Sequence, residues 1–396
     1  MGKGITYPLG FYASGINCGI KENNKEDLSL IYSVSSSIAS GTFTTNQFKS
    51  YSVLWSIKNI KNEIRAILIN SGNANACNGK KNWDLTKKLI EELSIKLKTD
   101  KNSILFASTG IIGVDLPYEK IRSGFDRLIE NLSPENNLLA VKGIMTTDTF
   151  PKEYEINTGI KGIKKEVFIG GMAKGSGMIN PNMATMLCFI TTDAVIDKKA
   201  LDIALKEAVE ESFNMITVDN DTSTNDTVIC LANGLARNKT IHIGTPEFEI
   251  FSNSLKILCR ELAKKIAFDG EGASKFIEVV VNGGWCKKDV KRVAKKVAGS
   301  YLVKTAIAGG DPNWGRIVAV VGSTNAKIDK KRMELKICGI KVFEGEPLNY
   351  NKENLINLMK DKEIKIEIDL KRGNFYATSW GCDLTEEYVK INKEYS

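Results

Sequence analysis

The chain has a single histidine, His242, among its 396 residues. Serine and cysteine enzymes of the triad type need an imidazole beside the nucleophile as a general base. His242 lies in the alternating segment KTIHIG, a pattern that favours one face of a strand. We therefore expect any covalent chemistry in this protein to use a base other than histidine.

Metal-binding and membrane features are also scarce. The eight cysteines are widely spaced without a C-x-x-C pair, so a zinc site is hard to assemble, and reduced thiols in a cytoplasmic protein are expected. No run of about 18 apolar residues occurs, and the first residues lack the apolar stretch of a secretory signal. We expect no metal, no bound cofactor and no membrane span.

The net charge of +8 comes from lysines spread along the chain, and no basic block is interleaved with aromatic residues. This distribution argues against nucleic-acid binding. The length exceeds one usual hydrophobic core, so two lobes are expected. The eight prolines are dispersed, and no linker marks a boundary between lobes.

Apolar periodicity predicts alternating strands and helices, as in an α+β protein with layered sheets. Strands are predicted at residues 64–70, 103–107, 184–191, 227–232, 276–282, 316–321 and 364–368. Helices are predicted at residues 83–98, 118–132, 198–213, 246–268 and 288–298.

The most unusual segment is GGMAKGSGMINPNMATMLCFITTDA, residues 170–194. Its glycines allow the backbone to approach a ligand closely. A phosphate-binding P-loop ends in Gly-Lys-Ser/Thr, whereas here Lys174 precedes Gly175, so that interpretation fails. A tight glycine loop that only leads into a core strand is the structural alternative.

A threonine that starts a strand after a flexible polar loop suits an N-terminal nucleophile. The Thr185 hydroxyl could attack the carbonyl of Ala184, and the ester formed by an N-to-O acyl shift would be hydrolysed by water. Cleavage would free the α-amine of Thr185, whose reference pKa of about 7.7–8.0 makes it a base at neutral pH. This chemistry needs no histidine.

Nine sequence blocks, in this order, resemble the ornithine acetyltransferase family, the bifunctional glutamate N-acetyltransferases of arginine biosynthesis. The blocks are GTFTTN (41–46), NSGNANACNG (70–79), ASTGIIG (107–113), MTTDTFPK (145–152), GMAKGSGMINPNMATML (171–187), DNDTSTNDT (219–227), DGEGASKF (269–276), GGDPNWGRI (309–317) and ATSWGCDLTEEYVKIN (377–392). The resemblance implies an αββα-type sandwich, as in self-processing N-terminal-nucleophile enzymes, with a smaller second lobe. It also implies an α fragment, residues 1–184, and a β fragment, residues 185–396, that share one core.

The resemblance makes Thr185 the nucleophile, and Ala184–Thr185 the bond that is cleaved. Thr109 and Gly110 match the oxyanion-hole pair of the family. The physical logic agrees, because a Thr-Gly turn at a strand end can aim a hydroxyl and an N–H at one point. A plain turn after a core strand is the alternative.

Substrate contacts follow from the same resemblance. Thr147 in MTTDT, Lys174 in the glycine loop and Glu271 in DGEG match such positions, and Thr147 is preferred over Thr146 for its spacing from the nucleophile. Lys174 could pair with a carboxylate or an oxyanion, and Glu271 with an amine. Without the resemblance, both charges would be assigned to the surface.

The carboxy-terminal residues depart from the family. The family ends with an asparagine and a hydroxyl residue five positions later, whereas here Asn392 is followed four positions on by Ser396. Both are retained as substrate contacts, and a frayed tail is the alternative. The acidic residues Asp219, Asp221 and Asp226 resemble a cation site by composition, but polar turns explain them equally well.

The resemblance implies a ping-pong reaction in the cyclic arginine pathway. Acetyl would pass from N-acetylornithine to Thr185, releasing ornithine, and then to glutamate, giving N-acetylglutamate. No motif decides whether acetyl-CoA is also a donor. The resemblance suggests a heterotetramer of two α and two β fragments, without nucleic-acid or membrane partners.

Two other functions remain open at this point. An N-terminal-nucleophile aminopeptidase or amidohydrolase on the same scaffold would use water in place of glutamate. A non-catalytic amino-acid-binding protein would keep its chain of 396 residues intact.

Overall fold

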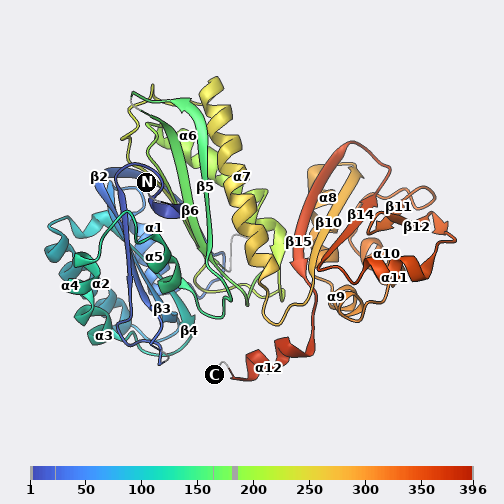
Figure 1. The fold of residues 1–396 in the computed structure, drawn as a ribbon, viewed down its shortest axis with the longest axis horizontal. Coiled ribbons are helices and arrows are strands. Elements are labelled where there is room, and N and C mark those ends of the chain that lie inside the picture. The colour runs from blue at the N-terminus through green and yellow to red at the C-terminus, as the bar shows by residue number, and fades with distance from the viewer. Residues whose placement is uncertain (1–2, 23, 164, 181–185, 395–396) are drawn as a thin grey trace. The chain divides into compact units, whose positions relative to one another are not determined.

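The computed structural model describes residues 3–22, 24–163, 165–180 and 186–394 (Figure 1). The chain forms two compact units. The first unit comprises Met1–Gly175, Pro181–Asn214 and Thr222–Ile266, and the second comprises Ser176–Asn180, Met215–Asp221 and Ala267–Ser396. Each unit is built around a sheet of its own.

The sheet of the first unit has eight strands in the order β4-β3-β2-β9-β7-β6-β5, with β1 paired to β2. The strands are β1 (Phe11–Ile16), β2 (Leu28–Phe43), β3 (Ile64–Asn73), β4 (Ile104–Ile111), β5 (Lys152–Lys161), β6 (Glu166–Lys174), β7 (Leu187–Thr192) and β9 (Thr227–Ala232). The α-helices are α1 (Tyr51–Asn59), α2 (Lys81–Leu97), α3 (Tyr118–Ser123), α4 (Phe125–Glu130), α5 (Asn137–Ile144), α6 (Lys198–Glu210) and α7 (Pro246–Phe268). Short 3₁₀ turns cover Gly4–Thr6, Lys101–Ser103 and Phe213–Met215.

Strand β2 is 16 residues long and divides this sheet into two layers. Its first half pairs with β1 and β3, and its second half pairs with β9. Alternate residues of β3 and β4 face opposite ways, because successive side chains of a strand point to opposite faces. One set packs with β6, β7 and β9 in a core between the layers, and the other packs under α1–α4.

Helices also cover the outer face of the second layer. Gly171 of β6 leaves so little space that an added Cβ would lie 3.0 Å from the side chains of Leu258 and Leu262 on α7. Figure 1 shows α6 and α7 beside β5 and β6, with α2, α3 and α4 flanking the other layer. The order helix, sheet, sheet, helix confirms the expected αββα sandwich.

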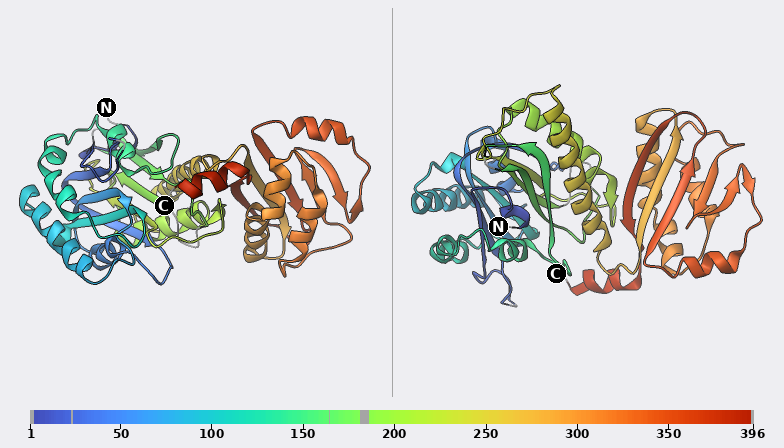
Figure 2. Two further views of the ribbon diagram at one scale, coloured as in Figure 1. Left: turned by 90° about the horizontal axis from the view of Figure 1, so that it is seen from below. Right: turned by 45° about the horizontal axis from the view of Figure 1, so that its top comes forward.

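The sheet of the second unit has seven strands in the order β13-β12-β11-β14-β10-β15-β8. They are β8 (Ile216–Thr217), β10 (Phe276–Gly284), β11 (Glu334–Ile337), β12 (Ile340–Glu344), β13 (Glu346–Pro347), β14 (Glu363–Asp369) and β15 (Phe375–Cys382). Its helices are α8 (Lys287–Ala298), α9 (Tyr301–Ala308), α10 (Trp314–Gly322), α11 (Lys352–Leu358) and α12 (Glu386–Glu394). Helix α8 packs on β10 and β15, and Figure 2 shows this unit from two further directions.

The predicted helix 246–268 and strand 227–232 match α7 and β9 at both ends. Helix α7 begins sharply because Thr245 Oγ1 accepts from the N–H of Phe248, at 3.2 Å, and Pro246 occupies the first helical position. The single helix predicted at 118–132 is instead α3 and α4, which meet at Gly124. A Cβ at Gly124 would lie 3.0 Å from Ile16 of β1, so the chain passes close to the sheet there.

Two predictions about strands are wrong. Residues 316–321 form most of α10 rather than a strand, because a short apolar run such as RIVAVV does not distinguish strand from helix. Its buried residues Ile317 and Val321 are four apart, as on one helical face. His242 follows an isolated bridge at Ile241 and is exposed in a loop, where its ring nitrogen Nδ1 lies 3.4 Å from Asp197.

All eight cysteines are free thiols, and several of them lie in strands. Among the described residues, every helix falls short of the length or the apolar character that crossing a bilayer requires.

Candidate active site

The turn expected at Thr109-Gly110 is wrong: both residues belong to β4 and pair with Ser71 and Gly72 of β3, and the parallel pairing becomes irregular only beyond them. Gly110 has a φ of +134°, and an added Cβ would lie 2.3 Å from the carbonyl carbon of Gly72. Only glycine fits, because the neighbouring atoms belong to backbone that cannot move aside. We call residues 108–110 the oxyanion turn after the role that the family resemblance gives to Thr109 and Gly110; both residues are half-buried.

Lys174 ends β6 and reaches this turn. Its side chain is buried, and its Nζ donates to Thr109 Oγ1 at 3.3 Å and to Thr146 Oγ1 at 2.7 Å. Because the Thr109 oxygen accepts this bond, its own hydrogen can point to another acceptor. The structure thus brings together two predicted site residues that are 65 positions apart.

A buried aspartate that the sequence analysis missed supports this arrangement. Asp148 Oδ1 accepts from the N–H of Gly175 at 2.7 Å and from Lys152 Nζ at 2.6 Å, and Oδ2 accepts from the N–H of Thr146 at 3.0 Å. The side chains of Asp148 and Lys152 are fully buried. Burial alone would raise the pKa of Asp148, but the charges of Lys174 and Lys152 outweigh it and lower that pKa to about 2.

Lys21 is a second residue that the sequence analysis missed. Its Nζ donates to the carbonyl oxygens of Glu26 at 2.8 Å and Met145 at 2.7 Å, so it holds the start of the MTTDT segment. Burial, with a smaller contribution from Lys174, lowers the pKa of Lys21 to about 8. Lys21 opens the charged segment KENNKED, and nothing in that pattern distinguishes it from a surface lysine.

The two threonines of MTTDT differ in their described contacts. Thr146 accepts from Lys174, whereas Thr147, the preferred residue, lies at the next position and is half-buried. The choice between them stays a prediction.

Ala184 and Thr185 lie outside the described residues. The described chain resumes at Met186, and β7 begins at Leu187, whose partner across β6 is Lys174. Thr185, the expected nucleophile, is therefore two positions before Leu187, the residue that pairs with Lys174.

Two further predicted residues are brought together in the second unit. Asn392 of α12 donates from Nδ2 to Glu271 Oε2 at 2.9 Å. Gly177 allows the Glu271 carboxylate to approach, because a Cβ there would lie 2.2 Å from Oε2. Ser396 lies outside the described residues.

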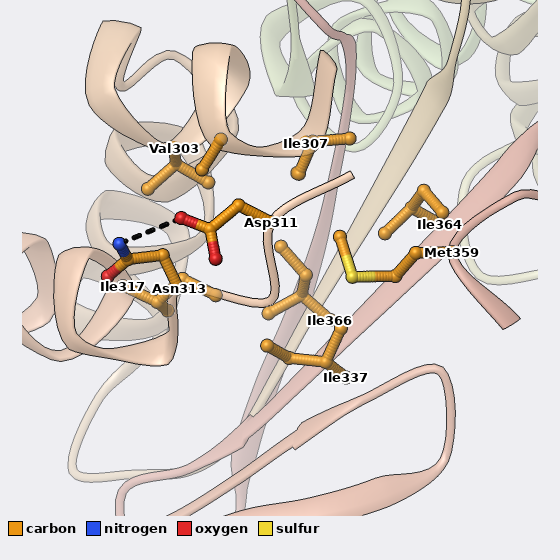
Figure 3. A pocket seen from close by; sticks show the side chains of 10 residues that line it. Val303, Ile307, Asp311, Asn313, Ile317, Ile337, Met359, Ile364 and Ile366 are labelled. Atoms are coloured by element: carbon orange, nitrogen blue, oxygen red, sulfur yellow. Dashed lines mark hydrogen bonds between the residues drawn. The ribbon is translucent and has the colours of Figure 1, made fainter. Parts of the chain in front are cut away.

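The acidic residues of DNDTSTNDT have structural partners. Asp219 accepts hydrogen bonds from the N–H groups of Met178 and Ile179. In the described ranges no three His, Cys, Asp or Glu side chains are grouped to hold a metal ion. Figure 3 shows an apolar pocket in the second unit whose polar lining residues, Asp311 and Asn313, hydrogen-bond to each other at 3.1 Å. It contains none of the predicted site residues.

A buried lysine within hydrogen-bonding distance of a threonine hydroxyl, on an αββα sandwich, is an arrangement that suits an enzyme of the acyl-transfer class. A model of the ArgJ family matches residues 12–396, and the chain belongs to this family. The expectation of an acetyltransferase of arginine biosynthesis is thereby confirmed.

Similar proteins cover the chain almost completely. The arginine biosynthesis bifunctional protein ArgJ of Caldanaerobacter subterraneus subsp. tengcongensis is 45% identical over 99% of this chain and 98% of its own length. ArgJ 1 of Clostridium acetobutylicum is 45% identical over 99% of this chain and 97% of its own length. A crystal structure of ArgJ from Bacillus halodurans, 44% identical, matches with a TM-score of 0.52 over 53% of this chain and 99% of that chain.

Proposed function

We propose that this acetyltransferase moves acetyl from N-acetylornithine to glutamate through an ester on Thr185. The observation that carries the proposal is the hydrogen bond from Lys174 Nζ to Thr109 Oγ1. It places a buried cation beside the hydroxyl that would stabilise an oxyanion, on the strand paired with the one that follows Thr185.

Self-cleavage prepares the nucleophile. The Thr185 hydroxyl attacks the carbonyl of Ala184, and hydrolysis of the resulting ester leaves an α-amine on Thr185.

Acetyl transfer then uses the same atoms. Thr185 Oγ attacks the acetyl carbonyl of N-acetylornithine, and the α-amine takes the hydroxyl proton. The Thr109 hydroxyl and the Gly110 N–H stabilise the oxyanion, and Lys174 adds positive charge beside it. The amide bond breaks, ornithine leaves with that proton, and the α-amine of glutamate attacks the ester to give N-acetylglutamate.

The remaining residues are proposed to bind the amino-acid portions of the substrates. Glu271 offers a carboxylate to an ammonium group, and Asn392 holds that carboxylate in place. Thr147 and Ser396 complete the proposed contacts. The assembly is proposed to contain two α and two β fragments, which would give a mass of twice the 43.7 kDa of one chain in light scattering.

The test is to incubate cleaved protein with labelled N-acetylornithine alone. Mass spectrometry should find one acetyl group on the peptide that starts at Thr185, and added glutamate should remove it as N-acetylglutamate. Thr185→Ala should stay as one band of full length and take up no label. Turnover without an acetylated Thr185 would contradict the mechanism.

Two further assays distinguish the functions that remain open. Release of acetate at the same rate with and without glutamate would indicate an amidohydrolase. Acetyl-CoA in place of N-acetylornithine tests whether this thioester is a second donor, since N-acetylglutamate would then form without any ornithine being released.

A further inference from the structure

The block DNDTSTNDT contains residues to which the proposed mechanism gives no role. Its last part, Asn225-Asp226-Thr227, leads into β9, which lies between β2 and β7 in the sheet of the first unit. All three residues are buried, with exposed fractions of 5%, 2% and 1%. Buried polar side chains at the end of a strand need hydrogen-bond partners, and these partners show what the segment does.

Asn225 uses its whole side-chain amide. Nδ2 donates to the carbonyl of Ala74 at 2.6 Å and to the carbonyl of Ser108 at 2.7 Å, while Oδ1 accepts from the Thr224 hydroxyl. With both donors and the acceptor engaged, the amide has one orientation. It forms a bond with the chain at the end of β3 and another with β4.

The bond to Ser108 bears directly on the oxyanion turn. The carbonyl of Ser108 and the N–H of Thr109 belong to one planar peptide, so fixing that oxygen also fixes the direction of the Thr109 N–H. Strand β3 pairs regularly with β4 through Thr109 and Gly110, and the pairing becomes irregular only beyond Gly72. Asn225 adds a further hydrogen bond to this peptide from the chain just before β9.

Asp226 and Thr227, the next two residues, hydrogen-bond to Met186, the residue that follows Thr185. The N–H of Thr227 donates to the carbonyl of Met186 at 3.0 Å, and the N–H of Met186 bonds to the Asp226 carboxyl. Burial raises the pKa of Asp226 well above its usual value, and its Oδ2 has no hydrogen-bond partner. Met186 directly follows Thr185, so both of its backbone groups are held one residue from the expected nucleophile.

We propose that Asn225 is a positioning residue for acetyl transfer, and that Asn225-Asp226-Thr227 sets the oxyanion turn in register with the chain after Thr185. The inference rests on the proposed function, because it assumes that Thr109 and Gly110 stabilise the oxyanion. A displacement of about 1 Å between reacting groups can reduce a rate about 100-fold, so a rigid tripeptide between the two strands has a catalytic effect without touching substrate.

The test replaces Asn225 with aspartate, which keeps the size but cannot donate to two carbonyls. The matched control is Asn233→Asp at the opposite end of β9. Asn233 is 8% exposed, against 5% for Asn225, and donates to the carbonyl of Leu9 at 2.8 Å, so each variant loses an amide donor beside one end of the same strand. For each, Tm, the cleaved fraction, kcat and KM are measured, with kcat calculated per chain that begins at Thr185.

We expect Asn225→Asp to lower kcat about 10- to 100-fold with KM within about threefold of the wild type. Asn233→Asp should lower Tm to a similar extent and leave kcat nearly unchanged. If Asn225→Asp does not fold or does not cleave, Thr224→Val serves in its place. It removes only the hydroxyl that orients the amide, and kcat should then fall about 3- to 10-fold.

An unchanged kcat in the folded variant would overturn the inference, and so would an equal loss in Asn233→Asp. A loss confined to KM would also overturn it, because substrate binding rather than the oxyanion turn would then be affected. A wild-type enzyme without glutamate-dependent acetyl transfer would instead contradict the proposed function, so the two failures are distinguishable.

Discussion

At the scale of single residues, Lys174 is the only described side chain shown here to contact the Thr109 hydroxyl, and the proposed mechanism gives its charge a part in stabilising the oxyanion. Lys174→Met removes the only charge that is described in contact with both Thr109 and Thr146. Loss of one oxyanion-stabilising group typically costs about 10²–10³ in rate, so kcat per cleaved chain should fall by this factor. Lys161→Met, on the exposed end of β5, should not change kcat. A kcat within threefold of the wild type in Lys174→Met would show that the cation has no catalytic part.

Asp148 gives a prediction about stability and pH. Its folded-state pKa of about 2 lies below its ordinary value of 3.8, so the ionised carboxylate stabilises the fold above about pH 4. This contribution of about 2 kcal/mol is lost as the pH falls from about 4 through 2. Asp148→Asn cannot titrate there. The free energy of unfolding of the wild type should therefore exceed that of Asp148→Asn by a large amount at pH 6, and this difference should be about 2 kcal/mol smaller near pH 2.

Urea unfolding at pH 6, 4 and 2.5 measures this gap. Breaking a buried ion pair typically costs about 3–5 kcal/mol, which sets the expected difference at pH 6. The control is Asp84→Asn, because Asp84 pairs with Lys87 on the exposed side of α2 and should change little at any pH. A gap that stays constant across the pH range would mean that the Asp148 carboxylate does not stabilise the fold.

Thr109, Gly110 and Lys174 were identified through sequence blocks that resemble the family; without that resemblance Lys174 would have been assigned to the surface. The structure brings Lys174 to Thr109, within hydrogen-bonding distance. Asn225 and Lys21 were not identified, because their roles depend on carbonyl groups more than 100 positions away along the chain. No periodicity or spacing reports such a partner.

At the scale of elements, the paired ends of β3 and β4 depend on a glycine. Gly110→Ala would place a Cβ 2.3 Å from Gly72 backbone, so the two strands must separate. We expect Tm and activity to fall together. Gly113→Ala is the control, because Gly113 also has a positive φ, +86°, but has open space around it. Gly113→Ala should lower the free energy of unfolding by only about 1 kcal/mol, because it introduces backbone strain without a steric clash. Equal effects of the two substitutions would show that strain, and not the close approach, is the cause.

The elements that were predicted well carry clear end signals, as α7 does with Thr245 and Pro246. Strand β2 was missed because its buried serines, among them Ser29, Ser33 and Ser37, interrupt the apolar alternation. These serines are buried on a strand that belongs to both layers of the sandwich, and one of them, Ser29, hydrogen-bonds to the carbonyl of Ala140 in α5 at 2.8 Å. A polar residue buried by tertiary contacts looks like a surface residue in the sequence.

At the scale of the whole molecule, no linker sequence marks a boundary between the two units, because the chain passes from one unit to the other several times. Segments Ser176–Asn180 and Met215–Asp221 belong to the second unit although their neighbours belong to the first. Each of these segments is under eight residues, too short for a change in composition to be visible. The family resemblance predicted a second lobe, but only the three-dimensional structure assigns its segments.

Cleavage at Thr185 would divide the sheet of the first unit, and this leads to a prediction about folding. Strands β7 and β9 of residues 185–396 lie between β2 and β6 of residues 1–184. Expressed alone, either fragment would expose the core between the two layers, so residues 1–184 should be unfolded or insoluble, and residues 185–396 should be insoluble or lack the part of the sheet formed by β7 and β9. Expressed together, they should fold and elute as one species, and separate only in denaturant. Circular dichroism and size-exclusion chromatography measure these states, with Thr185→Ala as the uncleaved control. Recovery of a folded, monomeric 1–184 fragment by itself would contradict the shared sheet, because that fragment would have to close the gap between β2 and β6 without β7 and β9.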